Sequence, residues 1–124
     1  MSTLKRYAND PNTPPGVLEY LARKYTVHTV VNVAANSNTP VETLCRLAQH
    51  TNPTIRASVA ENPKTPKEVL EALCKDRDLN VRFAMAESPH IGFAMLLQLV
   101  NDENPYVSCR AKKTIEKLNQ NKAP

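Results

Sequence analysis

Histidine and cysteine are the side chains of this sequence best suited to holding a metal ion. The chain contains His28, His50, His90, Cys45, Cys74 and Cys109. A structural zinc site needs four such ligands, usually in closely spaced pairs. These six residues are scattered along the chain and include no C-x-x-C pair. We therefore expect no metal centre and no cofactor, and we interpret the six as isolated residues.

Carboxylates and nucleophilic side chains are the next candidates for chemistry, but no catalytic motif contains them. The sequence has no Gly-rich phosphate loop, no H-E-x-x-H and no G-x-S-x-G. Glu68 and Glu71 lie near Lys67 and Lys75, a pattern typical of a solvated helix face with i,i+4 pairs. We predict no catalytic residues and no enzymatic activity.

Two arginines, Arg56 and Arg82, are 26 residues apart. One interpretation is a structural ladder in which each guanidinium pairs with a neighbouring carboxylate. The candidate partners are Asp76, Asp78 and Asp102. The other interpretation is a charged stripe that binds an acidic partner. We favour the ladder.

The net charge of the chain is concentrated near its C-terminus. Residues 110–124 hold five basic side chains and one acidic side chain, which account for the whole formal charge of +4. Such a patch can bind nucleic acid or another polyanion. The residues that would do so are Arg110, Lys112, Lys113 and Lys117. The alternative, which we favour, is a solubilising cap on the last repeat.

An internal repeat of 26 residues positions all of these side chains. Leucine recurs at Leu18, Leu44, Leu70 and Leu96 and at Leu21, Leu47, Leu73 and Leu99. Further columns are Ala8, Ala34, Ala60 and Ala86; Tyr7, Val33, Val59, Met85 and Ala111; and Asp10, Asn36, Asn62 and Ser88. Repeats of this length that hold over several copies are typical of stacked solenoids.

Each copy of the repeat predicts two short helices. Thr65-Pro66-Lys67-Glu68 fits a capping box with Thr65 as the N-cap of the first helix. The second helix follows a column of N-cap residues and ends at Asn-Pro or Ser-Pro. The N-cap column is Thr26, Asn52, Asp78 and Asn104. Helices of about ten residues are marginal alone, so packing on neighbours must stabilise them.

The predicted fold is therefore all-α, with about four two-helix repeats and a longer C-terminal capping helix. We expect one repeat domain over residues 1–124, with repeats at about 7–32, 33–58, 59–84 and 85–110 and a cap at 105–120. The predicted helices span 2–9, 14–24, 27–35, 40–50, 53–61, 66–76, 79–87, 92–101 and 105–119. Cys74 falls in a buried column of this repeat, whereas Cys45 falls in an exposed one.

The repeat resembles a known family, the leucine-rich repeat variant proteins. Residues 55–73 and 81–89 carry the resemblance. It implies a right-handed helical solenoid related in shape to HEAT and armadillo arrays. Some members of the family hold an iron–sulfur cluster in a cysteine-rich segment, but nothing in this chain matches that segment. The resemblance implies a fold and no reaction, because function is not set by fold alone.

Concave faces of solenoids bind extended partners, and one helix of each repeat lines that face. We take the helices at 27–35, 53–61, 79–87 and 105–119 as that set. Their outward columns predict a protein-binding face at His28, Asn32, Thr54, Ser58, Asn80 and Tyr106. Further outward positions are Ala84, Arg110, Ala35, Glu61 and Glu87.

The fourth repeat differs because its first helix is apolar on more than one side. Phe93 and Leu97 stand where earlier copies have Lys67 and Glu71. We expect the C-terminal helix to cover this excess in part and the remainder to form a contact patch, for example in a homodimer.

The expected function is a non-enzymatic repeat module that binds another protein or peptide through its concave face. The alternative is a nucleic-acid or polyanion binder acting through the C-terminal helix. Three widely spaced cysteines suit free thiols in a reducing compartment. The sequence shows no signal peptide and no apolar run long enough to span a membrane. We therefore expect a cytoplasmic protein without membrane contact.

Overall fold

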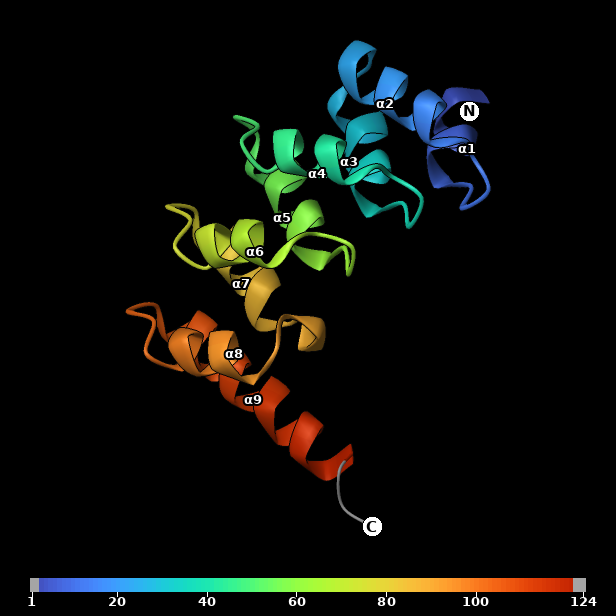
Figure 1. Cartoon of the computed structure of the whole chain (residues 1–124). Coiled ribbons are helices and arrows are strands. Elements are labelled where there is room, and N and C mark those ends of the chain that lie inside the picture. The colour runs from blue at the N-terminus through green and yellow to red at the C-terminus, as the bar shows by residue number, and fades with distance from the viewer. Residues whose placement is uncertain (1–2, 122–124) are drawn as a thin grey trace.

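The computed structural model describes residues 3–121 and is all-α over that range (Figure 1). The α-helices are α1 (Thr3–Asn9), α2 (Pro15–Lys24), α3 (Val27–Ala35), α4 (Val41–Leu47), α5 (Pro53–Glu61), α6 (Lys67–Leu73), α7 (Leu79–Ala86), α8 (Phe93–Val100) and α9 (Pro105–Asn121). A 3₁₀ turn, η1 (Pro89–Ile91), precedes α8. This confirms the predicted helical repeat and its longest, C-terminal helix.

The helices form two rows. In the first row each odd-numbered helix packs directly on the next, from α1 through α3, α5 and α7 to α9. The even-numbered helices form the second row, where each packs on at least one odd helix and the backbones of successive even helices approach one another less closely. Side chains still join this row, since Glu19 of α2 bonds Thr43 and Arg46 of α4. Figure 1 shows the repeats stacked in chain order, with α1 and α2 at one end and α8 and α9 at the other.

Two even helices are shorter than predicted. The sequence predicts helices over 40–50 and 66–76, but α4 ends at Leu47 and α6 ends at Leu73. Beyond these ends the backbone forms i→i−3 hydrogen bonds, such as His50 N to Leu47 O and Asp76 N to Leu73 O. The last turn therefore tightens into 3₁₀ geometry before the chain turns into the next helix.

The leucine and alanine columns form the core. All eight column leucines are at most 5% exposed, and the four column alanines are fully buried. The apolar column of Val33, Val59, Met85 and Ala111 is also fully buried, but its first member, Tyr7, is 50% exposed. Regular burial of the same positions explains why short helices hold together in this stack.

The N-cap column is confirmed at three of its four members. The side chains of Asn52, Asp78 and Asn104 accept hydrogen bonds from the backbone N–H two residues further on. Thr26, the fourth, makes no side-chain cap bond. Each satisfied cap removes one unpaired N–H at the start of an odd helix.

The predicted capping box at Thr65 is wrong. Pro66 is the N-cap of α6, and the Thr65 hydroxyl instead donates to the carbonyl of Val59 at 2.7 Å. Thr13 and Thr39 donate in the same way to the carbonyls of Tyr7 and Val33. Thr65 is only 5% exposed. The threonine column therefore satisfies the end of the preceding odd helix rather than the start of the following even one.

The polar column that begins at Asp10 forms a ladder between successive repeats. The Asn36 amide donates to the carbonyl of Ala8 at 2.8 Å, and the Asn62 amide donates to that of Ala34 at 2.8 Å. Ser88, which follows the end of α7, departs from the pattern and donates to the carbonyl of Ala84 in that helix. His90 Nε2 takes its place and lies 3.1 Å from the carbonyl of Ala60.

The final rung of this ladder is a threonine. The Thr114 hydroxyl donates to the carbonyl of Ala86 at 2.6 Å. The buried alanine column thus supplies an acceptor in each repeat, and the next odd helix or its flanking turn supplies a donor. Unpaired carbonyls in these dry positions would be costly, so the ladder fixes how one repeat sits on the next.

Cysteine reactivity tests this burial pattern directly. Cys74 is 4% exposed, as predicted, whereas Cys45 is half-buried rather than exposed and Cys109 is exposed. Burial, with a smaller contribution from the Glu71 charge, raises the pKa of the Cys74 thiol to about 11. In single-cysteine variants treated with a thiol reagent at pH 8, we expect Cys74 to react at least about 100-fold more slowly than Cys109. Similar rates, measured by mass spectrometry, would contradict the assigned core.

Candidate functional site

The exposed surface of α3, α5, α7 and α9 is the candidate functional site, here named the odd-helix face. Four of the six residues predicted for it are exposed, all in the first turn of an odd helix. They are His28, Thr54, Asn80 and Tyr106. Asn32 is half-buried. The cap residue two positions earlier fixes the first turn in three of these helices, so the exposed side chains occupy equivalent places.

Ser58 is not available to a partner, contrary to the prediction. It is 7% exposed, and its hydroxyl donates to the carbonyl of Val31 in α3 at 3.0 Å. Ala84, at the equivalent position of α7, is also buried at 6% exposed. Small residues here let successive odd helices approach closely, and that approach covers them. The column therefore belongs to the interface between odd helices.

A hollow lies on the odd-helix face near α9. It has a volume of about 190 Å³ and is lined by Phe83, Tyr106, Cys109, Arg110 and Lys113. Tyr106 is 75% exposed and is the most exposed large apolar side chain among the described residues. The hollow thus combines two aromatic rings with two cations, which suits an apolar group that carries a nearby negative charge.

Arg110 lies in this hollow and is held there by an ion pair and an aromatic ring. Its Nη2 lies 3.0 Å from Glu87 Oε2, and its guanidinium carbon lies 5.9 Å from the centre of the Phe83 ring. Its Nε is buried and has no hydrogen-bond partner within residues 3–121. The predicted anion-binding set is therefore divided. Arg110 and Lys113 line the hollow on the odd-helix face, whereas Lys112 and Lys117 are exposed elsewhere along α9.

Two glutamates give the middle of the odd-helix face a negative charge. Glu61 in α5 and Glu87 after α7 occupy equivalent, exposed positions. Partial burial raises the pKa of Glu61, and the charge of Glu87 raises it further. Because Arg110 pairs with Glu87, the face changes from acidic at α5 to basic at α9.

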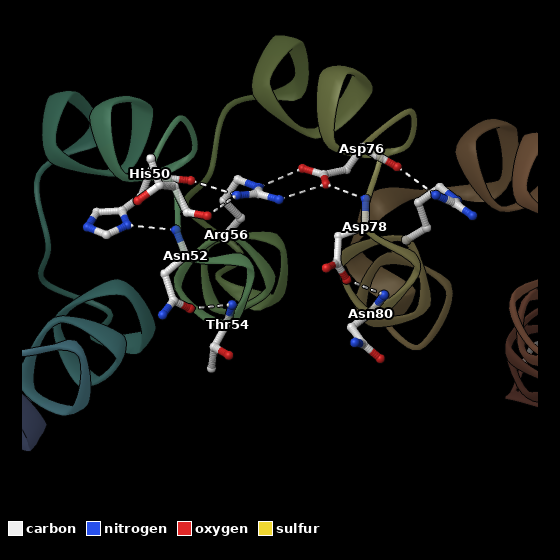
Figure 2. A network of polar contacts seen from close by, with 9 residues as sticks. His50, Asn52, Thr54, Arg56, Asp76, Asp78 and Asn80 are labelled. Atoms are coloured by element: carbon white, nitrogen blue, oxygen red, sulfur yellow. Dashed lines mark hydrogen bonds and ion pairs between the residues drawn. The ribbon is translucent and has the colours of Figure 1, made fainter.

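The arginine ladder predicted from the sequence is confirmed and lies along the loops that follow the even helices. Figure 2 shows its first pair, Arg56 with Asp76. Arg56 Nε lies 2.8 Å from Asp76 Oδ2, and Arg82 Nε lies 2.8 Å from Asp102 Oδ2. Asp78, the third candidate partner, instead caps α7. These side chains are at most 13% exposed, so they are structural and present no charged stripe to a partner.

Backbone contacts complete the ladder shown in Figure 2. Arg56 Nη1 also donates to the carbonyls of His50 and Thr51, and Arg82 Nη1 donates to that of Asp76. Burial tends to raise the pKa of Asp76, but the hydrogen bonds from Arg56 and from the Asp78 N–H lower it more, and the net pKa lies below its ordinary value.

Two of the three histidines have structural contacts. His50 Nδ1 accepts from the Asn52 N–H at 3.0 Å, and His90 belongs to the inter-repeat ladder. Among the described residues, no group of three or more His, Cys, Asp or Glu side chains is arranged to hold a metal ion. No helix in residues 3–121 is long and apolar enough to cross a bilayer.

The fourth repeat leaves two apolar side chains uncovered. Phe93 is 46% exposed and Leu97 is 45% exposed, whereas Met95, Leu96 and Leu99 of the same helix are buried. The packing of α9 on α8 therefore covers only part of the apolar excess. Both exposed residues lie on the even row, away from the hollow beside Tyr106.

Regular two-helix units, buried leucine columns and polar links between copies define a helical repeat protein. The family model for the Leucine Rich Repeat Variant domain matches residues 28–89, which is half of the chain. This chain belongs to that family. No curated protein and no solved structure shows significant similarity to it.

Proposed function

We propose that this chain is a non-enzymatic binding module that holds an extended peptide segment of another protein on its odd-helix face. The backbones of successive odd helices approach one another more closely than those of successive even helices, which suits an inner, concave row. Helical repeat arrays present such faces to extended partners. The observation that carries the proposal is the hollow beside Phe83 and Tyr106.

The chemistry of the face suggests what the peptide carries. An apolar side chain fits between Phe83 and Tyr106, and a carboxylate beside it would meet Arg110 and Lys113. A basic residue of the same peptide would meet Glu61 at the acidic middle of the face. Arg110, with its unsatisfied buried Nε, is held mainly by Glu87 and can exchange that exposed ion pair for a ligand at little cost.

A displayed peptide library selected on the immobilised protein tests this proposal. We expect selected peptides to pair an aromatic or aliphatic residue with a neighbouring acidic one. Their affinity, measured by fluorescence anisotropy, should fall roughly tenfold or more in Tyr106→Thr and in Phe83→Val, because aromatic anchors dominate interface energy. Thr54 and Val31 occupy the equivalent positions of other repeats, so both variants should fold.

The matched control is Leu97→Glu on the even row, which copies Glu71 of the preceding repeat and should bind the peptides unchanged. The double variant Lys112→Gln with Lys117→Gln distinguishes peptide binding from the polyanion alternative, because it removes two lysines of α9 and keeps Lys113 in the hollow. Peptide binding that survives this double change supports the proposal. Tight duplex DNA or RNA binding that weakens steeply with salt and disappears in the double variant would replace it with the polyanion function.

A further inference from the structure

The opposite end of the solenoid carries a larger apolar hollow between α1 and α2. Its volume is about 740 Å³, and its lining includes Leu4, Tyr7, Val17, Tyr20, Leu21 and Tyr25. Three of the four tyrosines of the chain therefore lie here. The rings of Tyr20 and Tyr25 meet edge to face with centres 6.1 Å apart. Exposed tyrosine clusters on apolar surfaces are typical of interfaces.

In the next repeat the positions equivalent to Tyr7 and Val17 of this surface are buried. Tyr7 is 50% exposed, whereas its equivalent Val33 is fully buried; Val17 is 40% exposed, whereas its equivalent Thr43 is 1% exposed. In the following repeat, α1 and α2 both pack on α3, and Glu19 of α2 accepts hydrogen bonds from Thr43 and Arg46 of α4. Within residues 3–121, no helix covers Tyr7 and Val17 in this way.

The side chains at this end also differ in kind from their equivalents. Tyr20 stands where later repeats have Arg46, Ala72 and Gln98, and Tyr25 stands where they have Thr51, Arg77 and Glu103. A surface meant only for water would keep the polar or small residues of the other copies. Large rings with a hydroxyl at the tip instead provide apolar area and hydrogen bonds at the rim.

The repeat identifies the occupant that fits. In the next repeat, α2 lies over Thr43, the equivalent of Val17, and the buried face of α2 carries Leu18 and Leu21, three residues apart. Residues 3–25 hold four basic and two acidic side chains, so an acidic polar face on the incoming helix is complementary. We propose that this hollow docks an acidic amphipathic helix of another protein, with a Leu-x-x-Leu stripe filling the space between Tyr7, Val17 and Tyr20.

Head-to-tail stacking of a second copy fits less well. It would require an even helix of one copy to lie over α1 of the next. The last even helix, α8, already packs closely on α9, which occupies the place that α1 would need. A helix of a different chain meets no such obstacle.

A peptide with the sequence of an even helix tests the docking surface. The sequence of α6, Lys-Glu-Val-Leu-Glu-Ala-Leu, is acidic on its polar side and carries the Leu-x-x-Leu stripe. Two tandem copies with a fluorescein label form the probe. We expect its anisotropy to rise with wild-type protein. The same peptide with every leucine changed to glutamine should show no rise, because the stripe supplies the buried area.

The matched protein variant is Tyr20→Arg with Tyr25→Thr, which copies Arg46 and Thr51 of the next repeat. Binding should weaken roughly tenfold or more, while circular dichroism shows the same helix content. Phe93→Lys at the far end of the even row and Tyr106→Thr on the odd-helix face should leave it unchanged. The latter control separates this proposal from the peptide-binding function.

Three results would overturn the proposal. The first is no binding of the probe by wild-type protein. The second is equal binding by the double tyrosine variant. The third is a wild-type dimer, detected by light scattering, that the same double change dissociates, since a second copy would then be the occupant.

Discussion

Replacing Leu70 with alanine should lower the free energy of unfolding by about 2–5 kcal/mol, through lost apolar transfer energy and an unfilled cavity. Leu70 is 5% exposed in α6 and belongs to a column that is leucine in all four repeats. Each even helix is short, and the backbones of successive even helices do not approach one another closely, so neighbouring even helices can fill little of the cavity. Urea unfolding followed by circular dichroism measures the change.

Two variants calibrate that result. Leu97→Ala removes the same atoms from a side chain that is 45% exposed and should cost less than about 1 kcal/mol. Thr65→Ala removes the buried bond to Val59 and should cost about 1–2 kcal/mol. If Thr65→Ala were more destabilising than Leu70→Ala, the assignment of the leucine column to the core would be wrong.

The repeat period predicts most of the fold because burial in a solenoid is itself periodic. A position that is apolar in every copy faces the same neighbours in every copy, so the leucine and alanine columns can be placed without a structure. The same reasoning succeeds for the caps at Asn52 and Asp78, since N-capping depends on residues only two positions apart. Helix ends are predicted less well, because the 3₁₀ turns after α4 and α6 depend on how the chain enters the next helix.

The polar columns are harder to interpret because their partners lie in a neighbouring element. Thr65 precedes proline and a glutamate, so the local pattern favours a capping box, yet its hydroxyl bonds the preceding helix at Val59. The Asn-Pro pair at Asn62 indicates a helix end, but the bond from its amide to Ala34 crosses 28 positions. The sequence does contain one indication of this bond, because asparagine recurs at positions 36 and 62. A buried amide that recurs with the period needs a hydrogen-bond partner that recurs with the same period, such as a backbone carbonyl.

The candidate site is predictable only where exposure follows from local structure. First-turn positions such as His28 and Asn80 project from the start of a helix, and they are exposed. Ser58 lies in the middle of α5, where exposure depends on how closely α3 approaches, and a single sequence does not give that distance. The tyrosine cluster at α1 and α2 escapes prediction for a different reason. Tyr20 and Tyr25 occupy columns that are small or polar elsewhere, and this departure from the repeat is the available signal.

The second large effect is expected at Arg56. Replacing it with valine should lower the free energy of unfolding by about 3–5 kcal/mol, because the Asp76 carboxylate stays buried without its cation. Arg56 and Asp76 side chains are 8% and 10% exposed. Arg77→Val, at an exposed neighbouring position, should change stability by less than about 0.5 kcal/mol. Urea unfolding at pH 7 compares the variants.

The preceding repeat provides the compensating change. Val30 and His50 stand at the positions equivalent to Arg56 and Asp76, and His50 accepts the same type of loop bond from Asn52 that Asp76 accepts from Asp78. The double variant Arg56→Val with Asp76→His should therefore lie within about 1–2 kcal/mol of wild type, although the first change alone is severe. Additive losses in the double variant would show that the arginine acts through packing alone.

The pH dependence of stability in Arg56→Val independently tests whether Arg56 neutralises the charge of Asp76. In the wild type the pKa of Asp76 lies below its ordinary value. The ionised carboxylate therefore stabilises the fold fully above the ordinary pKa, and this stabilisation is lost as pH falls from there through the lowered pKa of the folded state. Without Arg56 and its hydrogen bonds, burial raises that pKa, and protonation then relieves the buried charge. The gap in stability between wild type and Arg56→Val should therefore narrow as pH falls from 7 to about 3.5. A gap of constant size would mean that Asp76 is not the group whose charge the arginine neutralises.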